Sequence, residues 1–363
     1  MNTFILFGFV VSILNVVSCN SNSLEFVFAV FRHGDKTNEK TRIYESYPFA
    51  NETYFPIGRG LLTNKGKNTA FNLGKRLRLL YKNFLNEYYF PSDVYAVATD
   101  TERTKMTLEL VLAKLYPPRK TINQWHYGLN WQPIPFDVIP HGDNVASFPY
   151  ANCPKFVELY QKYYSSVFGT SLREKYAKLI QAMETFTGIK NVTYIHLCFL
   201  YTSFQADKEW GLKLPPWIDH NLENLQNAYI DFYNFTVNIP KLNKLSGGFL
   251  LQKITDALKQ KIETNSTQQI YLLSAHDNTI LYLMGILGVY YKHIPNYCAC
   301  FLIELHKVKG VYGVKIFYLH TVGAKPKPML IPKCGHFCEF EKFVRLYEKS
   351  ISIKPNACNV KQY

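Results

Sequence analysis

The chain has 363 residues, of which 47% are hydrophobic and 19% are charged. This composition excludes a disordered chain and allows one large globular domain or two smaller ones. Its 41 lysines and arginines outnumber its 27 acidic residues, and the formal net charge of +14 favours anionic ligands such as phosphate esters or acidic glycans. Because the basic residues are scattered along the chain, we expect no nucleic-acid partner.

The N-terminus has the pattern of a signal peptide. Residues 1–19, MNTFILFGFVVSILNVVSC, contain no charged side chain, and their apolar stretch from Phe4 to Val17 is too short to cross a bilayer comfortably. A small serine and a cysteine follow, as they do at cleavage sites. We therefore predict a signal peptide over 1–19 and a secreted mature protein over 20–363. No later segment approaches 18 uninterrupted apolar residues, so we predict no membrane span.

Four N-glycosylation sequons support a secreted protein. Eight cysteines also fit an oxidising compartment, and loss of Cys19 with the leader leaves seven, which suggests three disulfides and one free thiol. The sequons have their acceptors at Asn51, Asn191, Asn234 and Asn265.

The segment CGHFC has an alternative interpretation as a metal site. Cys334, His336 and Cys338 are all of ligand type, but no second ligand pair accompanies them. Since extracellular cysteines usually oxidise, we expect these cysteines to be oxidised, with partners that the segment itself does not identify, and we expect no metal or other cofactor in the protein.

Three apolar runs predict buried β-strands, each followed by a polar segment. They are EFVFAVF (25–31), VYAVA (94–98) and QIYLLS (269–274). After the first strand, Thr63 is expected to cap a helix over 64–85, and helices are also expected after the other two strands.

This alternation predicts an α/β sheet, in which ligands bind beyond the carboxyl ends of the strands. Between about 120 and 255 no clear buried strand appears, and we predict a mainly helical insertion that caps this edge. A second HGD triplet at 141–143 follows no strand and is interpreted as a coincidence within a loop. The side chains expected at the edge are Arg32, His33, Arg103, His276 and Asp277.

Two arginines and two histidines at one sheet edge suit a phosphate dianion. Guanidinium groups match phosphate oxygens, and a neutral imidazole can attack phosphorus to give a phosphohistidine. Asp277 could then protonate the leaving alkoxide, which requires a protonated carboxyl and hence favours acidic pH.

The segments FRHGDKTNE, TDTERT and LLSAHDNT resemble the three motifs of histidine acid phosphatases, within the histidine phosphatase superfamily. The similarity extends through WQPIP, NCPKF, LPPW and CGHFC. The resemblance implies an α/β fold, with a histidine phosphatase-like sheet flanked by helices and a mainly helical cap. It also implies that His33 is the nucleophile and Asp277 the proton donor, with phosphate ligands at Arg32, Arg103 and His276.

The same resemblance implies three disulfides and leaves Cys298 over. The implied pairs are Cys153 with Cys358, Cys198 with Cys300, and Cys334 with Cys338.

The first motif departs from the family pattern at two positions. Lys36 stands where the family has a second arginine, and Asn38 stands where it has proline. Lysine keeps the charge but loses the planar fork. Loss of one oriented donor from a transition-state pocket costs about 3 kcal/mol, or a hundredfold to a thousandfold in rate. We also expect Asn38 to free the loop that carries Lys36, so that activity falls without reaching zero.

The chain most resembles the arthropod branch of the family, which includes acid phosphatase-like proteins of flea saliva. Members of that group have lost catalytic positions and bind biogenic amines and leukotrienes. The resemblance implies a secreted salivary or venom-type protein that sequesters such mediators, including serotonin and catecholamines, with little or no phosphatase activity.

Specific side chains are candidates for contacting such mediators. Asp277 could pair with an ammonium group, and Arg32 with Arg103 could hold a lipid carboxylate. An aromatic box is expected near the start of the insertion, formed by Trp125, His126, Tyr127 and Trp131.

Two other functions stay open. Intact His33, His276 and Asp277 favour an active secreted acid phosphomonoesterase that hydrolyses phosphate monoesters. The net positive charge would also permit electrostatic binding to heparin-like glycans, which should collapse with added salt.

Overall fold

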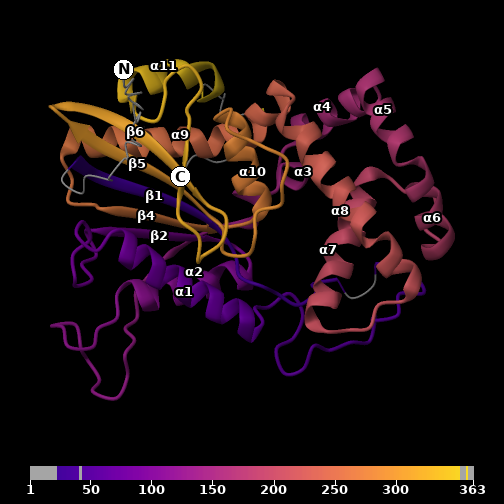
Figure 1. Ribbon diagram of the computed structural model, residues 1–363, viewed down its shortest axis with the longest axis horizontal. Helices are drawn as coiled ribbons and strands as arrows, with labels where there is room; N and C mark the ends of the chain where they lie inside the picture. Colours follow the sequence, from indigo (N-terminus) through magenta and orange to yellow (C-terminus); the bar gives the residue numbers. More distant parts are fainter. Residues whose placement is uncertain (1–22, 41–42, 352–356, 359–363) are drawn as a thin grey trace, which may run out of the picture.

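The computed structural model describes residues 23–40, 43–351 and 357–358, so the predicted signal peptide lies outside the described residues. The described residues form one mixed eight-stranded sheet with helices on both faces, and a further group of helices lies at one end of it (Figure 1). This confirms the predicted α/β fold with a helical cap. No helix in the described part of the chain is long and apolar enough to cross a membrane.

The parallel core of the sheet consists of the three predicted strands. β4 pairs in parallel with both β1 and β2, and the full strand order is β3-β2-β4-β1-β5-β6-β7, with β8 paired to β6. The short β3 extends the parallel half, whereas β5 to β8 form an antiparallel half that was not predicted from the sequence. The strands are β1 (Leu24–Arg32), β2 (Val94–Thr99), β3 (Asp137–Ile139), β4 (Ile270–Ala275), β5 (Cys300–Val308), β6 (Val311–Leu319), β7 (Lys327–Met329) and β8 (Cys338–Glu339).

Helices cover both faces of the sheet (Figure 1). α1 (Asn64–Leu80) and α2 (Glu102–Leu115) pack their apolar sides on one face. The other face is covered by α9 (Pro240–Thr264), α10 (Asp277–Ile286) and α11 (Phe340–Ile351). Thr63 caps α1 as predicted, because its hydroxyl accepts a hydrogen bond from the Gly66 amide at 3.0 Å.

The cap has its own hydrophobic cluster, joined to the sheet through the start of α9 and through α10. Its helices are α3 (Pro149–Asn152), α4 (Pro154–Tyr164), α5 (Val167–Lys175), α6 (Ala177–Thr187), α7 (Tyr194–Trp210) and α8 (Pro216–Val237). The helical cap is narrower than the predicted 120–255. Residues 120–148 are mostly loop with β3 and one short 3-10 helix, η2 (His141–Asp143), and most of α9 packs on the sheet.

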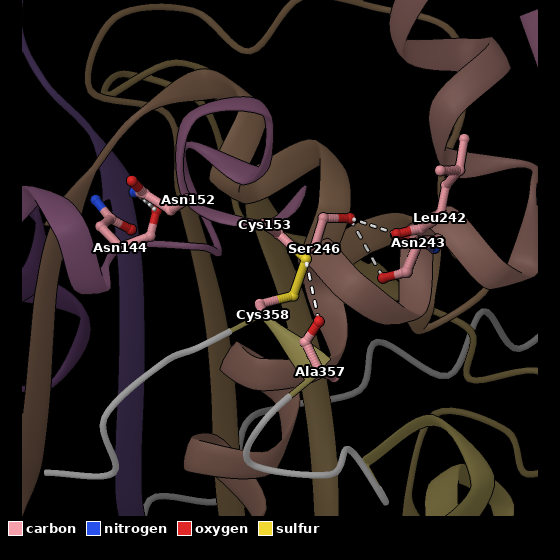
Figure 2. Close-up of a disulfide and its surroundings, with 8 residues drawn as sticks. All are labelled: Asn144, Asn152, Cys153, Leu242, Asn243, Ser246, Ala357 and Cys358. Atoms are coloured by element: carbon pink, nitrogen blue, oxygen red, sulfur yellow. Dashed lines mark hydrogen bonds between the residues drawn. A yellow bond between two sulfur atoms is a disulfide. The ribbon is translucent and has the colours of Figure 1, made fainter. Parts of the chain in front are cut away.

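A disulfide between Cys153 and Cys358 ties the start of α4 to the C-terminal segment (Figure 2). Next to it, the Asn152 side-chain amide donates to the carbonyl of Asn144 at 3.3 Å. The beginning of the cap is thus held both to the end of the chain and to the loop that follows β3.

A second disulfide joins Cys334 and Cys338, so the CGHFC cysteines are bonded to each other. The expected bond between Cys198 and Cys300 is wrong. Cys198 lies in α7 within the cap cluster, whereas Cys300 begins β5 on the sheet face covered by α1 and α2. Both are buried free thiols, as is Cys298.

Candidate active site

The ends of β1, β2 and β4 bring the predicted residues together beneath the cap. Arg32 ends β1, and the backbone amide of His33 donates to the carbonyl at the end of β4 at 3.0 Å. His276 follows β4 as the N-cap of α10, and Asp277 begins that helix. Arg103 lies in the first turn of α2. The imidazoles of His33 and His276 pack edge to face, with ring centroids 5.5 Å apart.

The imidazole of His33 is oriented by a backbone carbonyl. Its Nδ1 lies 2.8 Å from the oxygen of Gly34, so Nδ1 is assigned the proton and Nε2 keeps its lone pair. Burial, together with the positive charges of Arg103 and Arg32, holds the pKa of His33 well below its usual 6.5. The ring therefore stays neutral, and hence nucleophilic, in acidic solution.

Close backbone packing explains the glycine that follows His33. A Cβ on Gly34 would lie 2.6 Å from the carbonyl oxygen of Gly66 in α1. The Gly34 amide donates to the Thr107 hydroxyl of α2 at 3.1 Å. These contacts fix the loop after β1 against both helices on that face.

The Asp277 carboxylate is held between the cap and β1. Tyr229 of α8 donates to its Oδ2 at 3.0 Å, and Arg32 Nη2 lies 3.2 Å from the same oxygen. Arg32 also donates from Nη1 to the carbonyl of Pro295 at 2.6 Å, and its guanidinium lies over the ring of Tyr297. Both terminal nitrogens of the Arg32 guanidinium thus already have partners within the protein.

Lys36 lies in the loop after β1, near the same charges. Its Nζ lies 3.4 Å from the carbonyl of Thr37. Burial lowers the pKa of Lys36 to about 8; Glu39 opposes this shift, whereas Arg103 and Arg32 add to it. The lysine is thus a poorly solvated cation that loses its charge in mildly alkaline solution.

Glu39 introduces a carboxylate beside the predicted phosphate ligands. Its Oε2 accepts a hydrogen bond from Arg103 Nη1 at 2.8 Å. Burial opposes ionisation of Glu39, but Arg103 and Lys36 outweigh it and lower the pKa of the carboxyl. A phosphate dianion at Arg103 would therefore have to compete with the carboxylate of Glu39, whose side chain is 42% exposed.

Asn38 anchors its loop, so the expectation that it frees the loop is wrong. Its side-chain amide donates to both oxygens of Asp207 at 3.2 and 3.3 Å and to the Tyr47 hydroxyl at 2.9 Å. Asp207 lies in α7 and also accepts hydrogen bonds from the hydroxyls of Tyr47 and Tyr54. A proline at position 38 could not make these contacts, and the amide here joins the motif loop to the cap.

The expected aromatic box is also wrong. Trp125, His126, Tyr127 and Trp131 lie in a loop between α2 and β3, where Tyr127 is 94% exposed. α2 leads the chain away from the active edge, so this loop lies at the far end of the sheet (Figure 1).

Other aromatic groups line the site instead. Tyr229 and Tyr297 contact Asp277 and Arg32, and the Phe148 ring lies 4.9 Å from that of His276. His141 stacks on Phe148, so the second HGD triplet lies close to the site. The expectation that no strand precedes this triplet is wrong, because β3 ends at Ile139. Glu39 lies in the same motif as His33, so its position could have suggested it as a site residue. No local pattern in α8 distinguishes Tyr229 from the other residues of that helix.

Beneath the cap lies a neutral, oriented histidine that is flanked by two arginines, a second histidine and a carboxyl group. This arrangement defines a member of the histidine phosphatases. The model of the histidine phosphatase superfamily (branch 2) matches residues 23–318, and the chain belongs to this family.

Sequence relatives carry acid phosphatase names. The chain is 34% identical to "Venom acid phosphatase Acph-1" of Apis mellifera, across 94% of this chain and 89% of the bee protein. It is 30% identical to human "Lysosomal acid phosphatase", across 90% of this chain and 78% of that protein.

Solved structures of similar fold include phytases. The phytase of Klebsiella sp ASR1 matches with a TM-score of 0.67 at 14% identity, covering 91% of this chain and 96% of the phytase. The Hafnia alvei phytase in complex with myo-inositol hexakis sulphate gives a TM-score of 0.66 at 18% identity, covering 93% and 98%. At these identities the likeness shows the fold alone.

Proposed function

We propose that this protein binds small mediators in its phosphate pocket and hydrolyses phosphate monoesters slowly or not at all. The observation that carries this proposal is the 2.8 Å bond between Glu39 and Arg103, beside a lysine in place of a second arginine. A carboxylate on a phosphate-binding arginine repels dianions. It also gives the pocket a group that pairs with cations.

The charges and rings of the pocket suit biogenic amines. Glu39 and Asp277 are two carboxylates that an ammonium group could approach, and the electron-rich faces of Tyr229 and Tyr297 can stabilise a cation or stack on an aromatic ring. A leukotriene would use the pocket differently, because its carboxylates would have to displace Asp277 from Arg32 and Glu39 from Arg103.

Secretion in saliva or venom is part of the proposal. The leader-like residues 1–19 and the bee venom relative support it, whereas the human relative is named lysosomal. Asn51, Asn191 and Asn265 are exposed, as glycan acceptors must be. Asn234 is half-buried within α8 and is the least suited of the four.

Acid phosphomonoesterase activity is a second candidate, favoured by the orientation of His33. The Nδ1 contact with Gly34 leaves Nε2 free for attack on phosphorus. In this case Asp277 would protonate the leaving group.

Calorimetry and turnover together distinguish the two candidates. Wild type and Glu39→Gln would be titrated with serotonin, noradrenaline and a cysteinyl leukotriene, with the exposed Glu341→Gln as the matched control. We expect saturable amine binding that weakens only in Glu39→Gln. Absence of heat with every mediator, together with fast aryl phosphate hydrolysis at acidic pH, would establish the enzyme instead.

A further inference from the structure

A second cavity lies at the β3 edge of the sheet, on the face covered by α9. Its volume is about 850 Å³, within the range of small-molecule sites. Residues of β2, β3, β4, α9 and the segment 140–147 line it. The catalytic residues His33, His276 and Asp277 are not among its lining residues.

The cavity has an apolar floor with two aromatic rings. Val97, Leu273 and Leu250 belong to the hydrophobic cluster beneath α9 and line the cavity. The rings of Tyr95 and Tyr271 approach with centroids 4.8 Å apart, and Tyr95 is partly exposed. An apolar ligand body would therefore find both aliphatic and aromatic contacts.

The charged residues of the lining are mostly acidic. They are Asp137, Asp143 and Asp256, and Lys253 is the one cation among the described residues of the lining. The whole chain has a formal net charge of +14, so the charge of this lining is opposite in sign to that of the protein as a whole. Charge complementarity thus favours a cationic ligand.

Two buried polar groups of the lining have no hydrogen-bond partner among the described residues. They are the Tyr271 hydroxyl and the side-chain Nδ2 of Asn144, on residues that are only 5% and 3% exposed. Buried polar groups are usually satisfied, and both of these can donate a hydrogen bond. A ligand with an acceptor oxygen in its apolar body would complement them.

We propose that this cavity is a second ligand site, which binds an amphipathic organic cation with an acceptor oxygen on its apolar body. The ammonium group lies among Asp137, Asp143 and Asp256. The apolar body lies on Val97, Leu273 and the two tyrosine rings. This site is separate from the phosphate pocket and does not depend on the function proposed for it.

The active site and the cavity nevertheless share a wall. Thr99 lines the cavity, and its hydroxyl is hydrogen-bonded to Nε2 of His276 at 2.9 Å. Titrations of the cavity should therefore be made with the phosphate pocket saturated by sulfate, so that the two sites are measured apart.

The test is calorimetry of the full chain in sulfate with three probes that share one body: phenoxybutylamine, phenoxybutanol and phenoxybutyrate. We expect the amine to bind about tenfold more tightly than the other two, since it alone complements the acidic lining. Asp137→Asn and Asp256→Asn should each weaken amine binding about twofold to fivefold, and Lys253→Gln should strengthen it by a similar factor. Glu263→Gln, on α9 but outside the lining, is the matched control and should change nothing.

Two results would overturn the proposal. One is equal affinity for the three probes. The other is amine binding that ignores Asp137→Asn and Asp256→Asn but is lost in Glu39→Gln, which would place the amine in the phosphate pocket. Failure of the function proposed for the phosphate pocket is seen separately, as mediator binding without sulfate that is absent or that Glu39→Gln does not weaken.

Discussion

The two walls of the active site differ in how well they suit phosphate chemistry. The wall formed by the ends of β1 and β4 presents a neutral His33 with an oriented ring and a positioned Asp277. The wall formed by the motif loop and α2 presents a poorly solvated Lys36 and an Arg103 already bonded to Glu39. We propose that Lys36 and the bond between Glu39 and Arg103 weaken stabilisation of the transferring anion, whereas the orientation of His33 still suits attack on phosphorus.

The largest expected effect comes from changing Lys36 and Glu39. Both lie in the wall formed by the motif loop and α2, which we call the anion-holding wall. Lys36→Arg combined with Glu39→Gln restores a guanidinium fork and removes the competing carboxylate. We expect kcat/KM for an aryl phosphate at acidic pH to rise about a hundredfold to a thousandfold. Lys75→Arg, at an exposed position of α1, is the matched control. An unchanged rate in the double variant would mean that the anion-holding wall is not what limits turnover.

The next effect concerns the anchor of the motif loop. Asp207→Ala leaves the amide of Asn38 and the hydroxyls of Tyr47 and Tyr54 without their shared acceptor. We expect a loss of about 2–4 kcal/mol in the free energy of unfolding, measured by urea denaturation.

Asp219→Ala removes an exposed carboxylate that pairs with Lys208, and it serves as the control for Asp207→Ala. It should cost at most about 1 kcal/mol. Equal losses in the two variants would show that the Asp207 cluster does not anchor the loop.

A smaller effect is the pH dependence of anion binding. Lys36 is charged below its pKa of about 8 and neutral above it, so sulfate affinity should fall as pH rises through 8. Between pH 7 and 9 the decrease should reach about tenfold, because most of the lysine is then deprotonated. Sulfate keeps its own charge over this range. Lys36→Arg should remove the decrease, and a decrease that persists in this variant would assign it to another group.

The smallest effect concerns Cys300, which begins β5 and lies opposite Phe31 of β1 in the sheet. Cys300→Ala should cost about 1–2 kcal/mol in unfolding free energy, because it removes only a small buried side chain. Loss of a disulfide would cost about 2–5 kcal/mol. Burial also raises the pKa of the neighbouring Cys298 thiol to about 12, so the native protein should resist thiol reagents near neutral pH.

The parallel half of the sheet and its edge could be predicted because their signals are local. Apolar runs mark β1, β2 and β4, and each is followed at once by its polar side chains. The antiparallel strands were missed although β5 and β6 are long. Their positions depend on pairing with β1 and with each other, which no short window reveals.

The errors have a common physical origin in contacts between distant segments. Asn38 was expected to loosen its loop, but its partner Asp207 lies 169 residues further along the chain. Tyr229, which donates a hydrogen bond to Asp277, lies in the middle of α8, and no pattern in that helix distinguishes it. The loop around Trp125 has a composition typical of ligand sites, but the direction of α2 carries it to the opposite end of the sheet.

The most direct test of the difference between the two walls is to trap a phosphohistidine on the wild-type protein. The protein would be incubated with an aryl phosphate at acidic pH, quenched in alkali and mapped by mass spectrometry, with His33→Ala as the control. We predict slow phosphorylation at His33 in wild type, faster phosphorylation in the variant with Lys36→Arg and Glu39→Gln, and none in His33→Ala. If neither the wild type nor the variant with Lys36→Arg and Glu39→Gln forms phosphohistidine although both bind sulfate, His33 does not attack phosphorus. That result would contradict the proposed difference between the two walls.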